Sequence, residues 1–190
     1  LIVGGSSGIG LALANRLAAE GNKVVVLSRN LNQLQLSENI EYHKFNVLDE
    51  TQSFPTLDQE FSGLAYCPGS INLKPFKSLK EQDYIDDFKI NALGAVKVIN
   101  QYLPNLKKVE KSSIVFFSTV AVQTGMPYHA SIAMAKGAVE GLTHSLAVEF
   151  APKIRVNAIA PSLTDTPLAS KLLSNDEKKE ASAKKHPLNS

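Results

Sequence analysis

The chain has 190 residues, of which 44% are hydrophobic and 20% are charged, and these proportions exclude bulk disorder and fit one globular domain over residues 1–190. Lysine and arginine total 20 against 18 aspartate and glutamate residues, so the formal net charge is +2. A balance this even gives no electrostatic reason to expect a nucleic-acid partner or an anionic membrane.

Six short apolar segments are candidate strands. They span residues 1–3, 23–27, 42–45, 64–67, 113–118 and 155–159. Most are nearly all apolar and do not alternate with polar residues, which is typical of strands covered on both faces in a parallel sheet.

Helical patterns lie between these segments. Ile9, Leu13 and Leu17 share one helix face, and Gly21 follows as a C-terminal cap. The spacing of Ser78 and Glu81 is that of a capping box.

That capping box opens a long helical pattern, which we expect to end before Pro104. A further helix is predicted from residue 127 to 150, stopping near Pro152. The alternation of strands and helices predicts a doubly wound parallel α/β sheet with right-handed crossovers. Ligands in such sheets bind at the carboxyl ends of the strands.

The first predicted strand runs into the glycine-rich segment 4–10. Gly4, Gly8 and Gly10 leave bare main chain beside a ligand, and the helix that begins near Ile9 points its free N–H groups at the loop. We therefore predict a dinucleotide diphosphate site here, which also includes Ser6 and Ser7. The alternative is a tight strand-to-helix turn without a ligand.

Ser28, Arg29 and Asn30 follow the second predicted strand, where an acidic residue would accept hydrogen bonds from an adenosine ribose. A serine followed by an arginine favours NADP(H) over NAD(H), because a guanidinium binds a 2′-phosphate with two charge-assisted hydrogen bonds. The alternative is that Arg29 is only a solvated surface charge.

With these residues the sequence resembles the classical short-chain dehydrogenase/reductase family over essentially the whole chain. Gly4, Gly8 and Gly10 match its glycine motif, although Val3 stands where a threonine is usual. Segments 136–142 and 155–161 are close matches to the sixth helix and strand of the family. The resemblance implies a Rossmann-like, three-layer α/β/α domain.

Other positions match the family only in part. Asn46-Val47 stands where the family has Asp-Val at the adenine, and residues 66–69, Tyr-Cys-Pro-Gly, replace the usual Asn-Asn-Ala-Gly. Thr166 matches a threonine that approaches the nicotinamide carboxamide in relatives. The further cofactor contacts that the resemblance implies are Asn46, Val47, Cys67, Pro68, Gly69, Lys136, Pro161, Leu163 and Thr166.

The catalytic residues of the family are a serine, a tyrosine and a lysine, with the last two spaced as Tyr-x-x-x-Lys. The resemblance places Thr119 at the serine, Ile132 at the tyrosine and Lys136 at the lysine, and Asn91 at an asparagine that supports a water chain. Ile132 has no proton to exchange, and loss of a positioned general acid costs about 10²–10⁴ in rate.

Two hypotheses follow from this substitution. One is an NADP(H)-dependent oxidoreductase of small carbonyls or alcohols with a non-standard catalytic set. The other is a catalytically weak or inactive dinucleotide-binding protein, acting as a redox sensor or structural subunit. A third, weaker hypothesis is a reaction that needs no tyrosine acid.

His129 is one candidate for the missing acid. On the expected helix, residues 129, 132 and 136 share a face, which puts His129 one turn before Ile132. A neutral histidine tuned near pH 7 could serve as the acid, whereas Tyr128 should point elsewhere. The alternative is a partly exposed residue at the helix start with no catalytic role.

The remaining signals are weaker. Cys67 is the one cysteine, which fits a reducing cytoplasm, and no metal site is predicted because His43, His144 and His186 lack ligand spacing. The lysines after Asn175 predict a solvated helix; they are Lys178, Lys179, Lys184 and Lys185.

The resemblance also bears on assembly and on the ends of the chain. In relatives the helix at 127–150 is a dimer interface, so we expect a homo-oligomer, a dimer or a tetramer. Relatives continue with one more helix and a seventh strand, so we expect the natural chain to be longer. Residues 163–185 would form the substrate loop.

Overall fold

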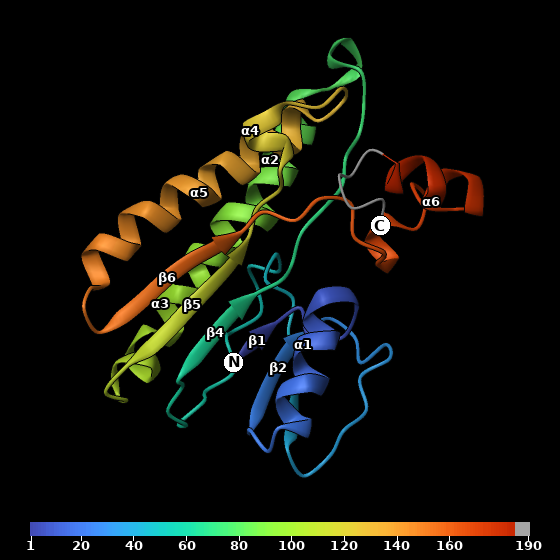
Figure 1. The fold of residues 1–190 in the computed structure, drawn as a ribbon. Coiled ribbons are helices and arrows are strands. Elements are labelled where there is room, and N and C mark those ends of the chain that lie inside the picture. Colours follow the sequence, from blue (N-terminus) through green and yellow to red (C-terminus); the bar gives the residue numbers. More distant parts are fainter. Residues whose placement is uncertain (185–190) are drawn as a thin grey trace.

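All six predicted strands are present, each within two residues of its expected bounds, and they form one parallel sheet (Figure 1). The structure, a computed structural model, describes residues 1–184. The strand order is β3-β2-β1-β4-β5-β6. The strands are β1 (Ile2–Val3), β2 (Val24–Ser28), β3 (Ile40–Lys44), β4 (Gly63–Tyr66), β5 (Ser112–Phe117) and β6 (Ile154–Ile159).

This order confirms the doubly wound, Rossmann-like fold. The chain builds outward from β1 to β3 and then crosses back to β4, so the winding reverses between β1 and β4. A crevice opens at the carboxyl ends of strands where the winding reverses, and ligands of this fold bind there.

Helices cover both faces of the sheet (Figure 1). The α-helices are α1 (Gly8–Ala19), α2 (Glu81–Phe88), α3 (Gly94–Lys107), α4 (Ala121–Thr124), α5 (Ala130–Phe150) and α6 (Asp176–Ala183). Short 3₁₀ turns are η1 (Phe76–Ser78) and η3 (Pro167–Ala169), and a π-helical segment, η2 (Lys89–Leu93), joins α2 to α3. Gly21 follows α1 with a φ of +83°, as its predicted capping role requires.

The capping box predicted at Ser78 is wrong by two residues. Ser78 belongs to η1, and α2 begins at Glu81 because the Asp83 carboxylate accepts a hydrogen bond from the Lys80 N–H (2.9 Å). An acceptor at the third helical position therefore determines where this helix begins.

The long helical pattern expected to run from this capping box and end before Pro104 is divided into α2, η2 and α3, and its expected end is wrong because α3 continues through this proline to Lys107. The Asn105 side chain donates hydrogen bonds to the carbonyls of Leu57 (2.6 Å) and Gln59 (2.8 Å). These tertiary contacts hold the last turn of α3 in place even though proline removes one main-chain donor.

Helix α5 begins at Ala130, three residues later than predicted. Gly125 and Tyr128 have φ values of +66° and +68°, and left-handed backbone there cannot continue into a helix. His129 is thus the N-cap residue of α5 and does not lie within its first turn.

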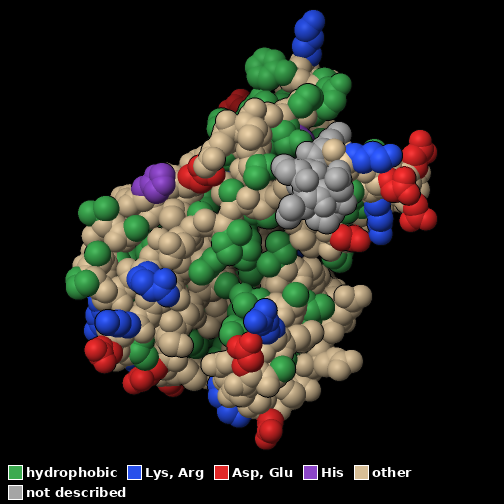
Figure 2. All heavy atoms as spheres, viewed as in Figure 1, with side chains coloured by type: hydrophobic (Ala, Val, Ile, Leu, Met, Phe, Trp, Pro, Cys, Tyr) green, Lys and Arg blue, Asp and Glu red, His purple; other side chains and the backbone are tan. Residues whose placement is uncertain are grey.

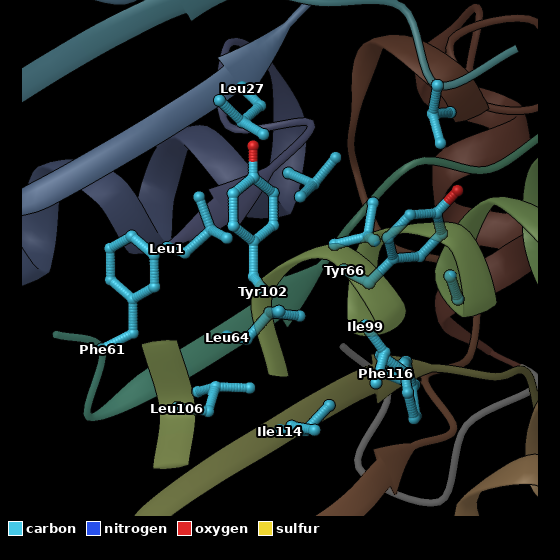
Figure 3. Packing of buried hydrophobic residues seen from close by; sticks show 14 of the residues in the cluster. Leu1, Leu27, Phe61, Leu64, Tyr66, Ile99, Tyr102, Leu106, Ile114 and Phe116 are labelled. Atoms are coloured by element: carbon cyan, nitrogen blue, oxygen red, sulfur yellow. The ribbon is translucent and has the colours of Figure 1, made fainter. Parts of the chain in front are cut away.

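The core consists of two apolar clusters on opposite faces of the sheet. The larger cluster packs α3 and α5 against β1, β2, β4 and β5, and Figure 3 shows Tyr102 and Tyr66 among the aliphatic residues of this cluster. The smaller cluster packs α1 against the other face of β1 and β2. Because β1 and β2 face helices on both sides, their residues are continuously buried.

The expectation of cover on both faces is wrong for β5 and β6. In β6 Ile154 and Val156 are buried against α5, whereas Arg155 and Asn157 on the opposite face are exposed. Among residues 1–184 only one face of this edge of the sheet is packed against a helix, so burial alternates with a period of two.

Candidate functional site

A cavity of about 720 Å³ lies at the carboxyl ends of the central strands. Its walls come from the segments that follow β1, β2, β3, β4, β5 and β6, together with α5 and α6. This volume falls in the range of small-molecule and cofactor sites. The cavity occupies the crevice that the strand order predicts.

The floor of the cavity is the glycine loop before α1. A Cβ at residue 10 would overlap the carbonyl oxygen of Gly4, so α1 approaches β1 more closely than any other residue permits. Gly4 has a φ of +77°, and a Cβ there would lie 3.0 Å from the Pro68 nitrogen. At these two glycines only main-chain atoms face the cavity floor.

The start of α1 is open to an anion. Ser7 is the N-cap residue, and its side chain makes no capping hydrogen bond; the first turn contains no acidic residue. The first N–H groups of a helix have no partner within the helix, and the first residues of α1, Gly8, Ile9 and Gly10, line the cavity. The residues present thus fit a diphosphate group.

The loop after β6 packs across the glycine loop. Thr166 Cγ2 lies 3.3 Å from the position that a Cβ of Gly8 would occupy. Pro161, Leu163 and Thr166 line the cavity as expected. Helix α6 also contributes, through Lys178, which the sequence pattern predicted only as a solvated residue. Lys185 of the same predicted run lies outside the described residues.

The end of β2 forms another wall. The Ser28 side chain is buried, and its hydroxyl donates to the carbonyl of Asn30 (2.9 Å). Arg29 beside it is exposed and makes no hydrogen bond or ion pair within residues 1–184. Asn32 connects this wall to the glycine loop, since its side-chain amide donates to Ser6 Oγ (3.2 Å).

The charges around the cavity are all positive. Among the described residues that line it, the charged side chains are Arg29, Lys136 and Lys178, and none is aspartate or glutamate. Figure 2 shows hydrophobic side chains across the middle of one face of the molecule and most charged side chains toward its rim. A cavity whose charged side chains are all cations favours an anionic ligand.

Asn46, Val47, Cys67, Pro68 and Gly69 line the cavity at the ends of β3 and β4. The Asn46 side chain accepts a hydrogen bond from the main chain of its own loop, and Val47 is buried. Burial raises the pKa of the Cys67 thiol to about 12. Cys67 is therefore a neutral thiol at physiological pH, which is unsuited to act as a nucleophile.

Lys136 reaches the cavity from α5 and donates a hydrogen bond from Nζ to the carbonyl of Phe117 (2.7 Å). Burial lowers the pKa of this lysine to about 8, and the negative charge of Asp87 opposes that shift. Near neutral pH Lys136 thus carries a positive charge that is only weakly solvated.

The residues expected near the reacting atoms also lie on the cavity wall: Thr119, His129, Ile132 and Lys136. Thr119 Oγ1 accepts from the Ala121 N–H (3.3 Å), and its own O–H has no acceptor within residues 1–184. Ile132 is buried, with 5% of its surface exposed. Among the described residues of the cavity none is tyrosine, and Tyr128 is 60% exposed at the surface, as predicted.

His129 is oriented by its own loop. Its Nδ1 lies 2.7 Å from the Pro127 carbonyl oxygen, which only accepts hydrogen bonds, so Nδ1 carries the proton. In the neutral ring Nε2 is then an acceptor. The neutral ring therefore has no proton on Nε2 to donate, so the predicted role of a neutral His129 as the acid does not fit this tautomer.

Asn91 does not reach the cavity. It lies in the π-helical segment η2 with 1% of its surface exposed, behind Gly69 and Ser70. The Tyr66 hydroxyl donates to the carbonyl of Ile90 (2.6 Å) in the same segment, so β4 holds this part of η2 in place.

Sequence reasoning did not find several residues of the cavity. Its apolar side chains come from loops without a recognisable motif; examples are Ile71, Leu73, Met126, Leu168 and Leu172. Ser70 and the buried Asp87 behind it were also missed. Ser70 directly follows the matched Gly69, and that adjacency is the one signal in the sequence that could have identified it.

Within residues 1–184 no group of three or more histidine, cysteine, aspartate or glutamate side chains is placed to hold a metal ion. None of the described helices combines the length and apolar character needed to cross a bilayer.

Comparison with known proteins places this geometry in context. The short chain dehydrogenase family model matches residues 1–177. Tropinone reductase-like 3 from Erythroxylum coca is 31% identical over 93% of this chain and 74% of its own. L-xylulose reductase from Bos taurus is 29% identical over 99% of this chain and 80% of its own.

Solved structures agree with the fold. The structure of ElxO with NADP bound has a TM-score of 0.82 and 28% identity, and the match covers 99% of this chain and 83% of that one.

Proposed function

Because the chain belongs to the short-chain dehydrogenase family, whose members are oxidoreductases acting on alcohol and carbonyl groups, we propose that it transfers a hydride between NADP(H) and a small carbonyl or alcohol. One observation carries the choice of cofactor. The cavity joins a bare glycine loop to three cationic side chains, with no carboxylate among its described residues. A ligand with three phosphate groups suits that charge better than one with two.

Different residues of the cavity would bind different groups of the cofactor. The main chain of Gly4 to Gly10 and the first turn of α1 would hold the diphosphate, and Arg29 would bind the 2′-phosphate. Lys136 would donate to the nicotinamide ribose. When bound, NADPH supplies a hydride to the carbonyl carbon of a substrate.

Two residues of the chain would bind and protonate the carbonyl oxygen of the substrate. Thr119 offers a free O–H, which would donate a hydrogen bond to that oxygen and hold it in place. The reduced substrate then needs one proton on the same oxygen to become an alcohol. We propose the His129 imidazolium, through Nε2, as the source of that proton.

A second candidate function is supported by Ile132. This side chain stands in the cavity four residues before Lys136, where relatives have the tyrosine acid. The alternative is therefore a dinucleotide-binding protein with little or no turnover, serving as a redox sensor or structural subunit. Turnover of NADPH across a panel of aldehydes and ketones separates the two functions.

The cofactor preference is tested by fluorescence titration of NADPH and NADH into the parent and Arg29→Ala. We expect the variant to bind NADPH about 10–100-fold more weakly, from the loss of charged hydrogen bonds, with NADH binding unchanged. Arg16→Ala is the control, since Arg16 pairs with Glu20 on α1 outside the cavity. Equal affinity of the parent for both nucleotides, unchanged in Arg29→Ala, would refute the preference.

We further propose a homo-oligomer and a cytoplasmic location. Met134 and Val148 on α5 are 52% and 81% exposed, which supports a second copy packing on this helix as in relatives. Light scattering coupled to gel filtration should give at least a dimer for the parent, and Val148→Glu should shift it toward the monomer. Subcellular fractionation tests the location, which the single cysteine supports.

A further inference from the structure

Asp87 is the most deeply buried carboxylate that the structure describes, with 2% of its surface exposed. It lies on α2, and no lysine, arginine or histidine among residues 1–184 forms an ion pair with it. One carboxylate oxygen, Oδ2, has no hydrogen-bond partner in the described part of the chain. Burying such a carboxylate costs several kcal/mol, so packing alone does not explain an aspartate here.

The other carboxylate oxygen belongs to a connected network behind the cavity. Ser70 Oγ donates to Asp87 Oδ1 (2.5 Å), and Asn91 Nδ2 donates to Ser70 Oγ (3.0 Å). Asn91 Nδ2 also donates to the main-chain carbonyl of Asp87 (2.8 Å). Since that carbonyl only accepts, the amide nitrogen of Asn91 must face Asp87, and its orientation is determined.

That orientation turns the amide oxygen of Asn91 toward Lys136. Asn91 Oδ1 is buried without a partner among residues 1–184. It lies 3.1 Å from the position that a Cβ of Gly69 would occupy, and Lys136 Nζ lies 3.6 Å from the same point. Glycine at position 69 thus leaves open the space between an unpaired acceptor and the lysine ammonium.

Few charges face that ammonium. Cys67 at the end of β4 stays a neutral thiol because burial raises its pKa to about 12. Glu140, one turn further along α5, accepts a hydrogen bond from Ser118 (2.5 Å), and His129 is bound to its own loop. Asp87 therefore remains as the anion that opposes the loss of the lysine proton.

We propose that Asp87 is a positioning residue of this site, which through Ser70 holds the Asn91 amide oxygen toward Lys136 and, through its own carboxylate, keeps the lysine charged. The effect on the lysine stands independently of turnover. The consequence for the cofactor rests on the proposed function, in which the charged lysine binds the nicotinamide ribose.

The lysine itself provides the first test. Protein labelled with ¹³C at lysine Cε is titrated by NMR, and the Lys136 signal is assigned by its loss in Lys136→Met. Asp87→Asn keeps the shape of the side chain and removes its charge. We expect the Lys136 midpoint to fall by about one pH unit, a tenfold change in the ratio of ammonium to amine.

Asp86→Asn is the matched control, because this neighbouring aspartate is exposed and accepts its hydrogen bond from Gln82 on the same helix. Asp86→Asn should have the same Lys136 midpoint as the parent. An equal midpoint in Asp87→Asn and the parent would overturn the proposal. Should Asp87→Asn not fold, Ser70→Ala tests the hydrogen-bonded link from Asp87 to Asn91. The Lys136 midpoint should fall in this variant, because the Asn91 amide oxygen is no longer held toward the lysine, and an unchanged midpoint would overturn the proposed positioning role.

NADPH titrations from pH 6 to 10 separate this inference from the proposed function. If the parent binds NADPH, its affinity should fall as the pH rises and Lys136 loses its proton. In Asp87→Asn this fall should occur at a lower pH, and the difference in pH should equal the shift of the Lys136 midpoint measured by NMR. If the parent binds no nucleotide, the proposed function fails while the NMR result still decides the role of Asp87. A folded Asp87→Asn whose binding follows the parent at every pH contradicts the role assigned to Asp87.

Discussion

Lys136 Nζ donates a hydrogen bond of 2.7 Å to the main-chain carbonyl of Phe117, the last residue of β5. The two residues are 19 positions apart, and their contact fastens α5 to the carboxyl end of the sheet. It also aims the lysine at the cavity. A binding group held ready in this way loses little side-chain entropy when a ligand arrives.

Lys136→Met should remove a cost to stability that depends on pH. The pKa of this lysine is lowered from 10.5 to about 8 by burial, so the unfolded chain holds the proton more tightly than the folded one. The cost to the free energy of unfolding is present below about pH 8 and disappears as the pH rises to 10.5. At roughly 1.4 kcal/mol per pH unit, the 2.5 units between these values give at most about 3.5 kcal/mol.

Urea unfolding of the parent and Lys136→Met at pH 7, 9 and 10.5 measures this difference. The two free energies should converge as the pH rises. The exposed Lys77→Met serves as the control for the loss of a surface lysine. A stability difference between parent and Lys136→Met that stays constant over this range would show that the lysine is not destabilised by burial.

Cys67 should react slowly although it lines the cavity. Burial raises the pKa of its thiol from 9.0 to about 12, so the thiolate fraction at pH 8 is about a thousandfold lower than in the unfolded chain. Alkylation by iodoacetamide, followed by mass spectrometry with and without urea, measures both rates. Similar rates in the folded and unfolded chain would contradict the raised pKa.

Ile132→Tyr should raise carbonyl reduction by about 10²–10⁴-fold, because it supplies a phenol on the cavity wall one turn before Lys136. Ile132→Phe adds the ring without the hydroxyl and should leave kcat near the parent value. Steady-state NADPH oxidation measures both variants. If the two variants have equal kcat, the hydroxyl is not the missing group.

Gly10→Ala should abolish nucleotide binding and lower stability by several kcal/mol, because its Cβ would overlap the Gly4 carbonyl oxygen and main chain would have to move. Gly141→Ala is the matched control, since a Cβ there meets no atom within 4 Å. In the middle of α5 it should add about 0.5–1 kcal/mol. Thermal unfolding and NADPH titration report both, and intact binding in Gly10→Ala would disprove the close approach.

Much of the fold and the cofactor side of the cavity could be predicted from the sequence. Buried parallel strands are continuous apolar runs, so all six were located within two residues. The residues expected at the cofactor all line the cavity, because the loops that follow parallel strands meet at one edge of the sheet. Their roles in binding remain predictions.

The errors came from tertiary contacts that leave no local pattern. Asn105 stabilises the part of α3 beyond Pro104 by hydrogen bonds to carbonyls that lie 46 and 48 residues away in the sequence. Helix α5 begins later than predicted because the backbone of Tyr128 is left-handed. Asp87 stands beside the exposed Asp86 in a polar helix sequence, and nothing in that pattern reveals which of the two faces the site. Only packing distinguishes them.

The hydrogen bond between Tyr66 and η2 connects the cavity to a residue that does not line it, Gly94. The Tyr66 hydroxyl fills the space beside Gly94, where any Cβ would collide with it. A larger residue at position 94 would push out this phenol and release the Ile90 carbonyl that it holds, one residue before Asn91. Gly94 does not itself line the cavity, yet inherited changes at this glycine would disturb the cavity wall from behind, through Ile90.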